Sequence, residues 1–277
     1  MEFITLYNGV KMPILGFGTY KAKGDDCANA VKWALEAGYR MIDTAEMYQN
    51  EKEVAKGIKA AGVKREDLFI VTKVSFKSYE NAREAVMNSL KNLETDYLDL
   101  VLLHWPIANY YKAWRELEKL YKEGVIRAIG VSNFDPDRLI DVLSFNEIKP
   151  MINQIETHLY CQRKVDHEYE DKYGVAHMGY SPIGQGKINE VFDEPLVIEL
   201  AKKYNKTVQQ ILIRFSIDLG VVTIPKSVHK ERIEANFNVL DFSLTKEEMK
   251  KLGELDKAHP NTGRAEDPKR IEYSLTW

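Results

Sequence analysis

The sequence feature that most constrains this fold is a repeated alternation of short apolar runs with segments of helical periodicity. From residue 15 onward, each apolar run is followed by a loop and then by a segment whose apolar residues recur at helical spacing. Such alternation is typical of parallel strands joined by crossover helices. The chain offers eight of these units and lacks the glycine-rich first turn of an open doubly wound sheet. We therefore predict the α/β class and a closed (β/α)8 TIM barrel.

The eight units are assigned to residue ranges as follows. The predicted strands are Leu15–Gly18, Met41–Asp43, Leu68–Val74, Tyr97–His104, Ile126–Val131, Met151–Glu156, Ala176–Tyr180 and Val221–Pro225. The predicted helices are Asp26–Ala37, Asn50–Ala61, Asn81–Leu93, Tyr111–Glu123, Pro136–Ser144, Arg163–Tyr173, Pro195–Lys203 continuing through Val208–Leu219, and Lys230–Val239.

Segments at both ends lie outside this repeat. Two apolar-alternating runs flank Asn8-Gly9, which predicts an N-terminal β-hairpin that closes the bottom of the barrel. After the last unit we expect an extra C-terminal helix and a short polar tail from His259 to Trp277. Because no Gly/Ser/Pro-rich stretch divides the chain, residues 1–277 are expected to form a single domain.

Composition limits the partners of the chain. The net charge is −3, and no run of five like charges occurs, so we expect no nucleic-acid and no membrane partner. The N-terminal residues lack the pattern of a signal peptide, and we expect a cytoplasmic protein that is a monomer or a weak homodimer. Cys27 and Cys161 have no metal-ligand spacing and are expected to be reduced thiols. No metal site is predicted.

Ionisable residues recur where the predicted strands end, which is the edge that carries the chemistry in this fold. Asp43, Lys73 and His104 are each about one strand-helix unit apart, so they should face the same mouth of the barrel. Tyr48 follows Asp43 on a loop. Asn50 and Glu53 predict a capping box at the start of the next helix, which would hold that loop in place.

Each of these residues also has an ordinary interpretation. Asp43 alone could cap a helix, Lys73 could be solvated, and His104 could be a hydrogen-bonded core histidine. Their common spacing favours one cluster, and structural ion pairing is the remaining alternative. In such a cluster the Lys73 ammonium would lower the pKa of the Tyr48 phenol, and Asp43 would keep the lysine charged. These groups suit general acid catalysis at a carbonyl oxygen.

A series of short motifs resembles that of the aldo-keto reductases. The motifs occur in the family order and are Gly16-Phe-Gly18-Thr19, Arg40-Met-Ile-Asp-Thr-Ala45, Tyr48-Gln-Asn-Glu51, Val71-Thr-Lys73, His104-Trp-Pro106, Gly130-Val-Ser-Asn-Phe134, Asn153-Gln154, Tyr180-Ser-Pro182 and Ile224-Pro-Lys-Ser227. The resemblance implies an NADPH-dependent oxidoreductase that reduces aldehydes, ketones or dicarbonyls. It also implies a catalytic tetrad of Asp43, Tyr48, Lys73 and His104, with Tyr48 as the proton donor.

The same resemblance implies the residues of the cofactor site. Tyr180 matches the aromatic residue that stacks on the nicotinamide, and three polar residues match the positions that hold its carboxamide: Ser132, Asn133 and Gln154. Further matching positions lie along the rest of the cofactor and are Gly18, Thr19, Ser181, Ile183, Lys226, Ser227, His229, Arg232 and Asn236. Lys226 and Arg232 would clamp the 2′-phosphate, which favours NADPH over NADH. A solvated helix face is the alternative reading of residues 230–232.

The substrate side is implied by Tyr20, Tyr48, His104 and Trp105. Two positions depart from the family pattern, since Ser75 replaces a frequent tryptophan and Ala235 replaces an acidic residue at the adenine. With a short tail and a short loop after Trp105, we expect little cover over the pocket and broad tolerance for small aldehydes and dicarbonyls. Two other functions stay open: a non-catalytic nucleotide-binding barrel, and an aldolase or isomerase that uses Lys73 as a Schiff-base nucleophile.

Overall fold

The chain closes a parallel barrel of eight strands, as the sequence predicts. The computed structural model describes every residue except 187, 259, 265–266, 275 and 277, so both ends of the predicted tail, His259 and Trp277, lie outside the described residues. All seven strand pairs of the sheet are parallel, and their order follows the chain from β3 to β10. A parallel bridge from Leu15 to Thr223 joins the first strand to the last and closes the ring.

Strands and helices alternate along the barrel. The strands of the barrel are β3 (Phe17–Gly18), β4 (Met41–Asp43), β5 (Phe69–Val74), β6 (Leu100–Leu103), β7 (Ile129–Ser132), β8 (Ile152–Glu156), β9 (Ala176–Tyr180) and β10 (Val222–Ile224). The helices are α1 (Gly24–Ala37), α2 (Glu51–Ala61), α3 (Ala82–Asn92), α4 (Tyr110–Lys122), α5 (Pro136–Phe145), α6 (Lys164–Tyr173), α7 (Pro195–Tyr204), α8 (Val208–Asp218), α9 (Lys230–Phe237), α10 (Lys246–Gly253) and α11 (Pro268–Ser274).

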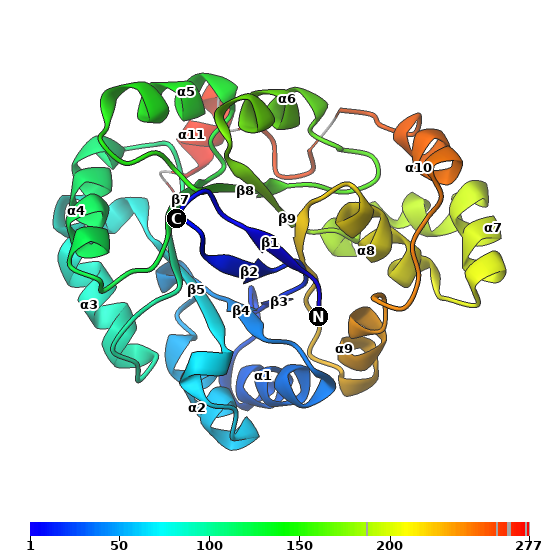
Figure 1. The fold of residues 1–277 in the computed structure, drawn as a ribbon, viewed down its shortest axis with the longest axis horizontal. Helices are drawn as coiled ribbons and strands as arrows, with labels where there is room; N and C mark the ends of the chain where they lie inside the picture. The colour runs from blue at the N-terminus through cyan, green and yellow to red at the C-terminus, as the bar shows by residue number, and fades with distance from the viewer. Residues whose placement is uncertain (187, 259, 265–266, 275, 277) are drawn as a thin grey trace.

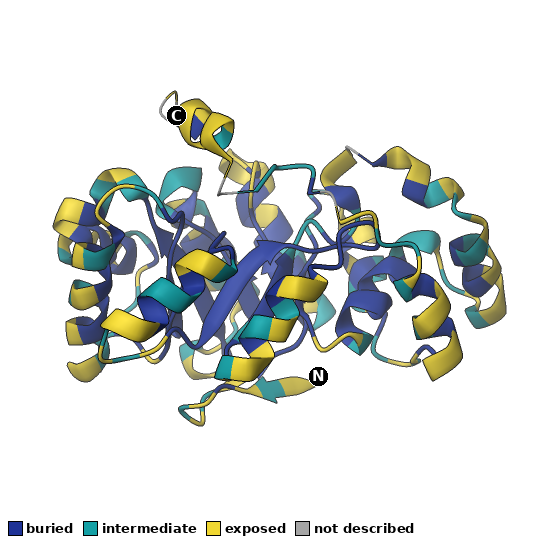
Figure 2. Cartoon of the chain, turned by 90° about the horizontal axis from the view of Figure 1, so that it is seen from above, coloured by how far each residue is buried: buried dark blue, intermediate teal, exposed yellow. Residues whose placement is uncertain are grey.

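The two openings of the barrel are covered by different segments. The antiparallel hairpin of β1 (Phe3–Thr5) and β2 (Lys11–Pro13) lies across one opening (Figure 1). Two residues of the hairpin, Leu6 and Met12, are buried. The C-terminal helix α11 lies at the opposite opening (Figure 2). Figure 2 also shows that the barrel strands are buried while the outer helix faces are exposed. The hairpin therefore closes the bottom, as expected, and leaves the carboxyl ends of the strands for the site.

Helices pack closely where the sequence provides small residues. At Gly57 of α2, an added Cβ would lie 2.5 Å from the Ala28 oxygen of α1, so only glycine allows this approach. None of the described helices is both long and apolar enough to span a bilayer.

Three local predictions differ from the structure. The stretch from Pro195 to Leu219 forms two helices, because Asn205 adopts a left-handed conformation and Thr207 forms a capping box for α8. The tail contains a second helix, α11. The predicted strand from Tyr97 starts three residues later, at Leu100, and the Asp99 carboxylate just before it accepts a hydrogen bond from the backbone N–H of Ile70.

The predicted capping box at Asn50 is wrong. Asn50 is the N-cap of α2, but its side chain makes no capping hydrogen bond. Its amide group instead donates to the backbone oxygens of Thr19 and Ala22, at 3.0 Å each, and its oxygen accepts from the Thr44 hydroxyl. Asn50 therefore ties the loop after β3 to the loop after β4, which holds the same segment in a different way.

A buried polar network lies between the barrel and α6. His177 of β9 faces Glu170 through Nδ1 and the Thr157 hydroxyl through Nε2, and its ring stacks on His167 at 3.8 Å. His167, Glu170 and His177 have possible ligand atoms within 4.8 Å of one another. Because the stacked rings place their lone pairs in nearly parallel planes, and both nitrogens of His177 are engaged, these atoms do not converge on one point. We interpret the cluster as a structural network.

This network makes the stability of the protein sensitive to acid. Burial lowers the pKa of His167 to about 3, so the unfolded state takes up a proton at higher pH than the folded state. Stability contributed by the neutral ring is therefore lost as the pH falls below the ordinary histidine value of ~6.5. We expect His167→Phe, which keeps a flat ring against His177, to narrow the stability difference between pH 7 and pH 5 by about 2 kcal/mol.

Urea unfolding of both proteins at the two pH values measures this difference. His229→Asn serves as the control, because His229 is exposed. The same pH dependence in wild type and in His167→Phe would contradict the prediction.

Candidate active site

A buried ion pair forms the centre of the site. Lys73 Nζ, on β5, donates to Asp43 Oδ1, at the end of β4, at 2.7 Å and to the Thr44 backbone oxygen at 2.8 Å. The side chains are 0% and 3% exposed. Burial lowers the pKa of Lys73, and the charge of Asp43 and its hydrogen bond act against this shift. The carboxylate therefore favours the charged form of the lysine, as expected from the sequence.

Tyr48 lies beside this ion pair on a short 3-10 turn, Glu46–Tyr48. Its hydroxyl oxygen is 3.4 Å from Lys73 Nζ, and the ammonium lies 5.0 Å from the ring centroid. The His104 ring stands edge-on to the Tyr48 ring with 5.7 Å between centroids. The four residues of the predicted tetrad are thus brought together at the mouth of the barrel.

The protonation states differ in one respect from our expectation. Burial, followed by the charge of Asp43, raises the pKa of Tyr48 well above its ordinary value. The prediction that Lys73 would lower the pKa of this phenol is therefore wrong for this structure, because desolvation of the phenolate outweighs the ammonium. Tyr48 is a neutral phenol at pH 7 and can donate its proton.

His104 is also neutral. Burial, with a smaller contribution from Lys73, lowers its pKa well below the ordinary histidine value. Its Nδ1 is buried and has no hydrogen-bond partner among the described residues. A neutral imidazole beside Tyr48 can donate one N–H to an oxygen atom in the mouth without competing for the proton of the phenol.

Amide side chains extend the site across the barrel. Gln154 of β8 donates from Nε2 to Asp43 Oδ2 at 2.7 Å, so the second carboxylate oxygen is also bonded. Asn133 Nδ2 donates to the His104 backbone oxygen and to the Ser132 hydroxyl, and Asn133 Oδ1 accepts from the Tyr180 hydroxyl at 2.8 Å. The four residues predicted to surround a nicotinamide therefore form one connected group next to the tetrad.

Strands β3 and β10 bring together, at the rim of the barrel, further residues that were predicted to bind the cofactor. The Gly18 N–H donates to the Pro225 oxygen, and an added Cβ at Gly18 would lie 3.2 Å from the Ile224 oxygen, which requires a small residue there. The Thr19 hydroxyl donates to the Asp43 backbone oxygen. Beyond β10 come the remaining rim residues: the half-buried Lys226, the buried Ser227 and Asn236, and the exposed His229 and Arg232.

Two further residues predicted to bind the cofactor, Ser181 and Ile183, follow strand β9. Ser181 follows β9 with a positive φ of 57°. Ile183 packs against both apolar cores of the molecule. Their backbone therefore turns at the mouth, close to the end of the strand that carries Tyr180.

Aromatic residues line the outer part of the mouth. The ring of Tyr20, 45% exposed, lies 5.0 Å from Tyr48, and Trp105 stacks at 6.3 Å on His104. The sequence did not indicate the role of Tyr79, whose hydroxyl donates to the Trp105 backbone oxygen and accepts from its N–H. Tyr79 lies on the turn after β5 and holds the Trp105 backbone in place through these two hydrogen bonds.

The tail contacts the rim of the mouth directly, at Tyr180 and Trp105. The Thr262 hydroxyl is 3.1 Å from the Tyr180 hydroxyl, and the Thr262 N–H donates to Glu156 Oε2. The guanidinium of Arg270 lies 4.5 Å above the ring of Trp105. These contacts join residues far apart in sequence. Of these residues, only Glu156 could be connected to the site from the sequence, since it lies two residues after Gln154 on the same face of a strand.

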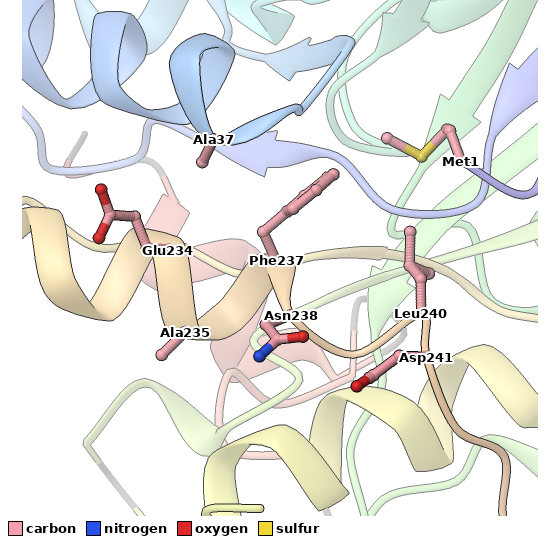
Figure 3. A pocket seen from close by; sticks show the side chains of 8 residues that line it. All are labelled: Met1, Ala37, Glu234, Ala235, Phe237, Asn238, Leu240 and Asp241. Atoms are coloured by element: carbon pink, nitrogen blue, oxygen red, sulfur yellow. The ribbon is translucent and has the colours of Figure 1, made fainter.

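A separate hollow of about 790 Å³ lies next to the C-terminal end of α9. Figure 3 shows the side chains that line it. Among the described residues, its lining includes Ala235 and the carboxylates of Glu234 and Asp241, and it includes no lysine or arginine. A hollow with this lining is poorly suited to an anionic dinucleotide. Ala235 faces this hollow, whereas its neighbour Asn236 is buried.

Fold and site together define a (β/α)8 barrel with a phenol, a lysine and an imidazole gathered at the carboxyl ends of its strands. A sequence model of the Aldo/keto reductase family matches residues 14–257. The chain therefore belongs to the aldo/keto reductase family and is an enzyme of the oxidoreductase class.

Individual relatives agree with this assignment. A glyoxal reductase of Bacillus subtilis is 45% identical over 92% of this chain and 93% of its own. A 9,11-endoperoxide prostaglandin H2 reductase of Trypanosoma cruzi is 45% identical over 92% and 91%. Among solved structures, the Bombyx mori aldo-keto reductase in complex with NADP has a TM-score of 0.89 at 36% identity, covering 98% of this chain and 96% of that chain.

The buried ion pair can be tested by removing one charge or both. Asp43→Asn leaves the Lys73 ammonium buried without its counter-ion, and we expect the free energy of unfolding to fall by about 3–5 kcal/mol. The double variant Asp43→Asn/Lys73→Met leaves no charge to bury and should recover much of this loss. Denaturant unfolding of the three proteins measures both effects. A double variant no more stable than the single one would show that the two charges are not coupled.

Proposed function

We propose that the protein reduces aldehydes, ketones or dicarbonyl compounds to alcohols with NADPH. One observation carries the proposal: a partly buried, neutral Tyr48 lies beside Lys73 and a neutral His104 at the mouth of a barrel of this family. This arrangement offers a proton and a hydrogen bond at the same place, which is what a carbonyl oxygen needs as it becomes an alcohol.

The residues of the chain have separate tasks in this reaction. Bound NADPH would supply the hydride that adds to the carbonyl carbon. Tyr48 donates its proton to the carbonyl oxygen, and His104 donates a hydrogen bond that orients that oxygen. Lys73 stabilises the phenolate that remains, and Asp43 holds Lys73 in position through the 2.7 Å contact. The aldolase alternative is weakened by the same contact, because a Schiff-base lysine acts as a neutral amine.

The side chains at the mouth suit a nicotinamide dinucleotide at both of its ends. Asn133, Ser132 and Gln154 offer amide and hydroxyl groups next to the Tyr180 ring, as a carboxamide requires. Lys226, Ser227 and Arg232 offer two cations and a hydroxyl at the other end, which suits a 2′-phosphate. The NADP complex of the Bombyx mori relative and the names of the relatives, glyoxal reductase and methylglyoxal reductase, support this assignment.

We further propose that residues 1–277 act as a single domain in the cytoplasm, as a monomer or weak homodimer. The partners are small carbonyl compounds, and the net charge of −3 supports the absence of nucleic acid or membranes among them. A non-catalytic nucleotide-binding barrel is disfavoured because it would have no use for the desolvated phenol.

Tyr48→Phe tests the proton donor. Removal of the hydroxyl should lower kcat for reduction of a test aldehyde by about 10²–10⁴, the usual contribution of general acid catalysis. Binding of NADPH, measured by quenching of protein fluorescence, should change little, because the hydroxyl is assigned to the substrate. Equal loss of binding and turnover would indicate a collapsed site instead.

The double variant Lys226→Ala/Arg232→Ala tests the choice of coenzyme. Loss of both cations should weaken NADPH at least about tenfold more than NADH, since only NADPH carries the 2′-phosphate. Titration of each variant with both coenzymes measures the ratio. Lys230→Ala, an exposed cation on the same helix that pairs with Glu234, is the control. Parallel weakening of the two coenzymes would contradict the assignment of the clamp.

A further inference from the structure

A carboxylate on the turn of Tyr48 bonds the segment that follows the next strand. Glu46 is the first residue of the 3-10 turn that ends at Tyr48. Its Oε2 accepts a hydrogen bond from the Ser75 N–H at 2.7 Å, and its Oε1 accepts one from the Ser78 hydroxyl at 2.5 Å. We propose that Glu46 is a positioning residue that fixes the Tyr48 hydroxyl beside Lys73. This inference rests on the proposed carbonyl reduction, and it adds a residue that acts through the proton donor.

The two hydrogen bonds join the loops after two neighbouring strands. Ser75 directly follows β5, two residues after Lys73, and is 4% exposed. Lys73 Nζ already bonds the Thr44 backbone oxygen ahead of the turn. Glu46 makes its contacts within the turn itself, two residues before Tyr48. The Glu46 carboxylate therefore ties the segment of the phenol to the segment of the ammonium, where the two groups are 3.4 Å apart.

The backbone of this turn sets its shape but not its place on the barrel. The N–H groups of Tyr48 and Gln49 donate to backbone oxygens within the turn, at 3.0 and 3.1 Å. Such local bonds still allow the turn to move as a unit. Asn50, just after the turn, bonds the loop after β3. Glu46 supplies the attachment on the side of β5, so the turn is held at both of its ends.

The segment after β5 also holds the backbone next to His104. It continues as the 3-10 turn η3 (Phe76–Asn81). The Tyr79 hydroxyl of this turn donates to the Trp105 backbone oxygen at 2.7 Å and accepts from its N–H at 3.0 Å. The η3 turn therefore connects the turn of the phenol with the residue after the imidazole. Both groups must meet one carbonyl oxygen, so their relative position decides whether the proton is delivered.

A carboxylate is well suited to this task. An ionised acceptor forms shorter and stronger hydrogen bonds than a neutral one, and two bonds to two oxygens fix direction as well as distance. A proton donor must lie within hydrogen-bond reach of the atom that it protonates, and a displacement of about 1 Å can cost about 10² in rate. Loss of Glu46 should therefore slow the chemical step, while the proposed cofactor residues on the far side of the barrel stay in place.

Glu46→Ala tests this role. We expect the single-turnover rate for reduction of a test aldehyde by the NADPH complex to fall about tenfold to a hundredfold, whereas the dissociation constant of NADPH should change little. Glu46→Gln keeps an oxygen for the Ser75 N–H and should restore most of the rate. Glu66→Ala removes an exposed carboxylate from the 3-10 turn that precedes β5, and this control should keep the wild-type rate.

A second comparison separates positioning from general damage. In the Tyr48→Phe background the proton-donating hydroxyl is gone, so adding Glu46→Ala should change the residual rate little. A fall by the same factor in both backgrounds would overturn the inference, as would a wild-type rate in Glu46→Ala or no recovery in Glu46→Gln. If Glu46→Ala does not fold, Ser78→Ala removes one of the two partners, and an unchanged rate in that variant overturns the inference as well. A wild-type rate in Tyr48→Phe would instead contradict the proposed function, so the two failures are distinguishable.

Discussion

The structure of the site depends on one buried ion pair. Lys73 and Asp43 are almost fully removed from water, and each charge would be unfavourable there without the other. The remaining polar atoms are satisfied as well, since Thr44 accepts from the lysine and Gln154 donates to the carboxylate. The pair therefore joins β4, β5 and β8 across the barrel, and it fixes the position of the ammonium beside Tyr48.

Burial also sets the protonation states of the side chains next to this pair. The same low-polarity surroundings raise the pKa of Tyr48 and lower the pKa of His104, so both side chains are neutral near pH 7. In the proposed reaction the neutral phenol of Tyr48 gives up its proton, and the nearby Lys73 ammonium then stabilises the phenolate. The outer part of the mouth does not depend on an ion pair of this kind. Aromatic rings and the tail form it, through stacking and hydrogen bonds.

Much of the fold could be predicted because a parallel barrel requires a periodic pattern of apolar residues in the sequence. Apolar runs alternate with helical segments, and ionisable residues at strand ends recur once per unit, which indicated Asp43, Lys73 and His104 as neighbours. Local details were less predictable. Asn50 looks like a helix cap in sequence, but Thr19 and Ala22 offer its side chain competing acceptors that belong to another loop.

The sequence by itself determined the barrel, the order of its strands, and the identity of the residues at its mouth, because these follow from periodicity and from short motifs. Only the tertiary structure decided the direction of the pKa shift of Tyr48, since desolvation depends on everything packed around the phenol. It also decided that the tail contacts Tyr180 and Trp105. Such contacts join residues far apart in the chain through single side chains, and no local pattern in the sequence encodes them.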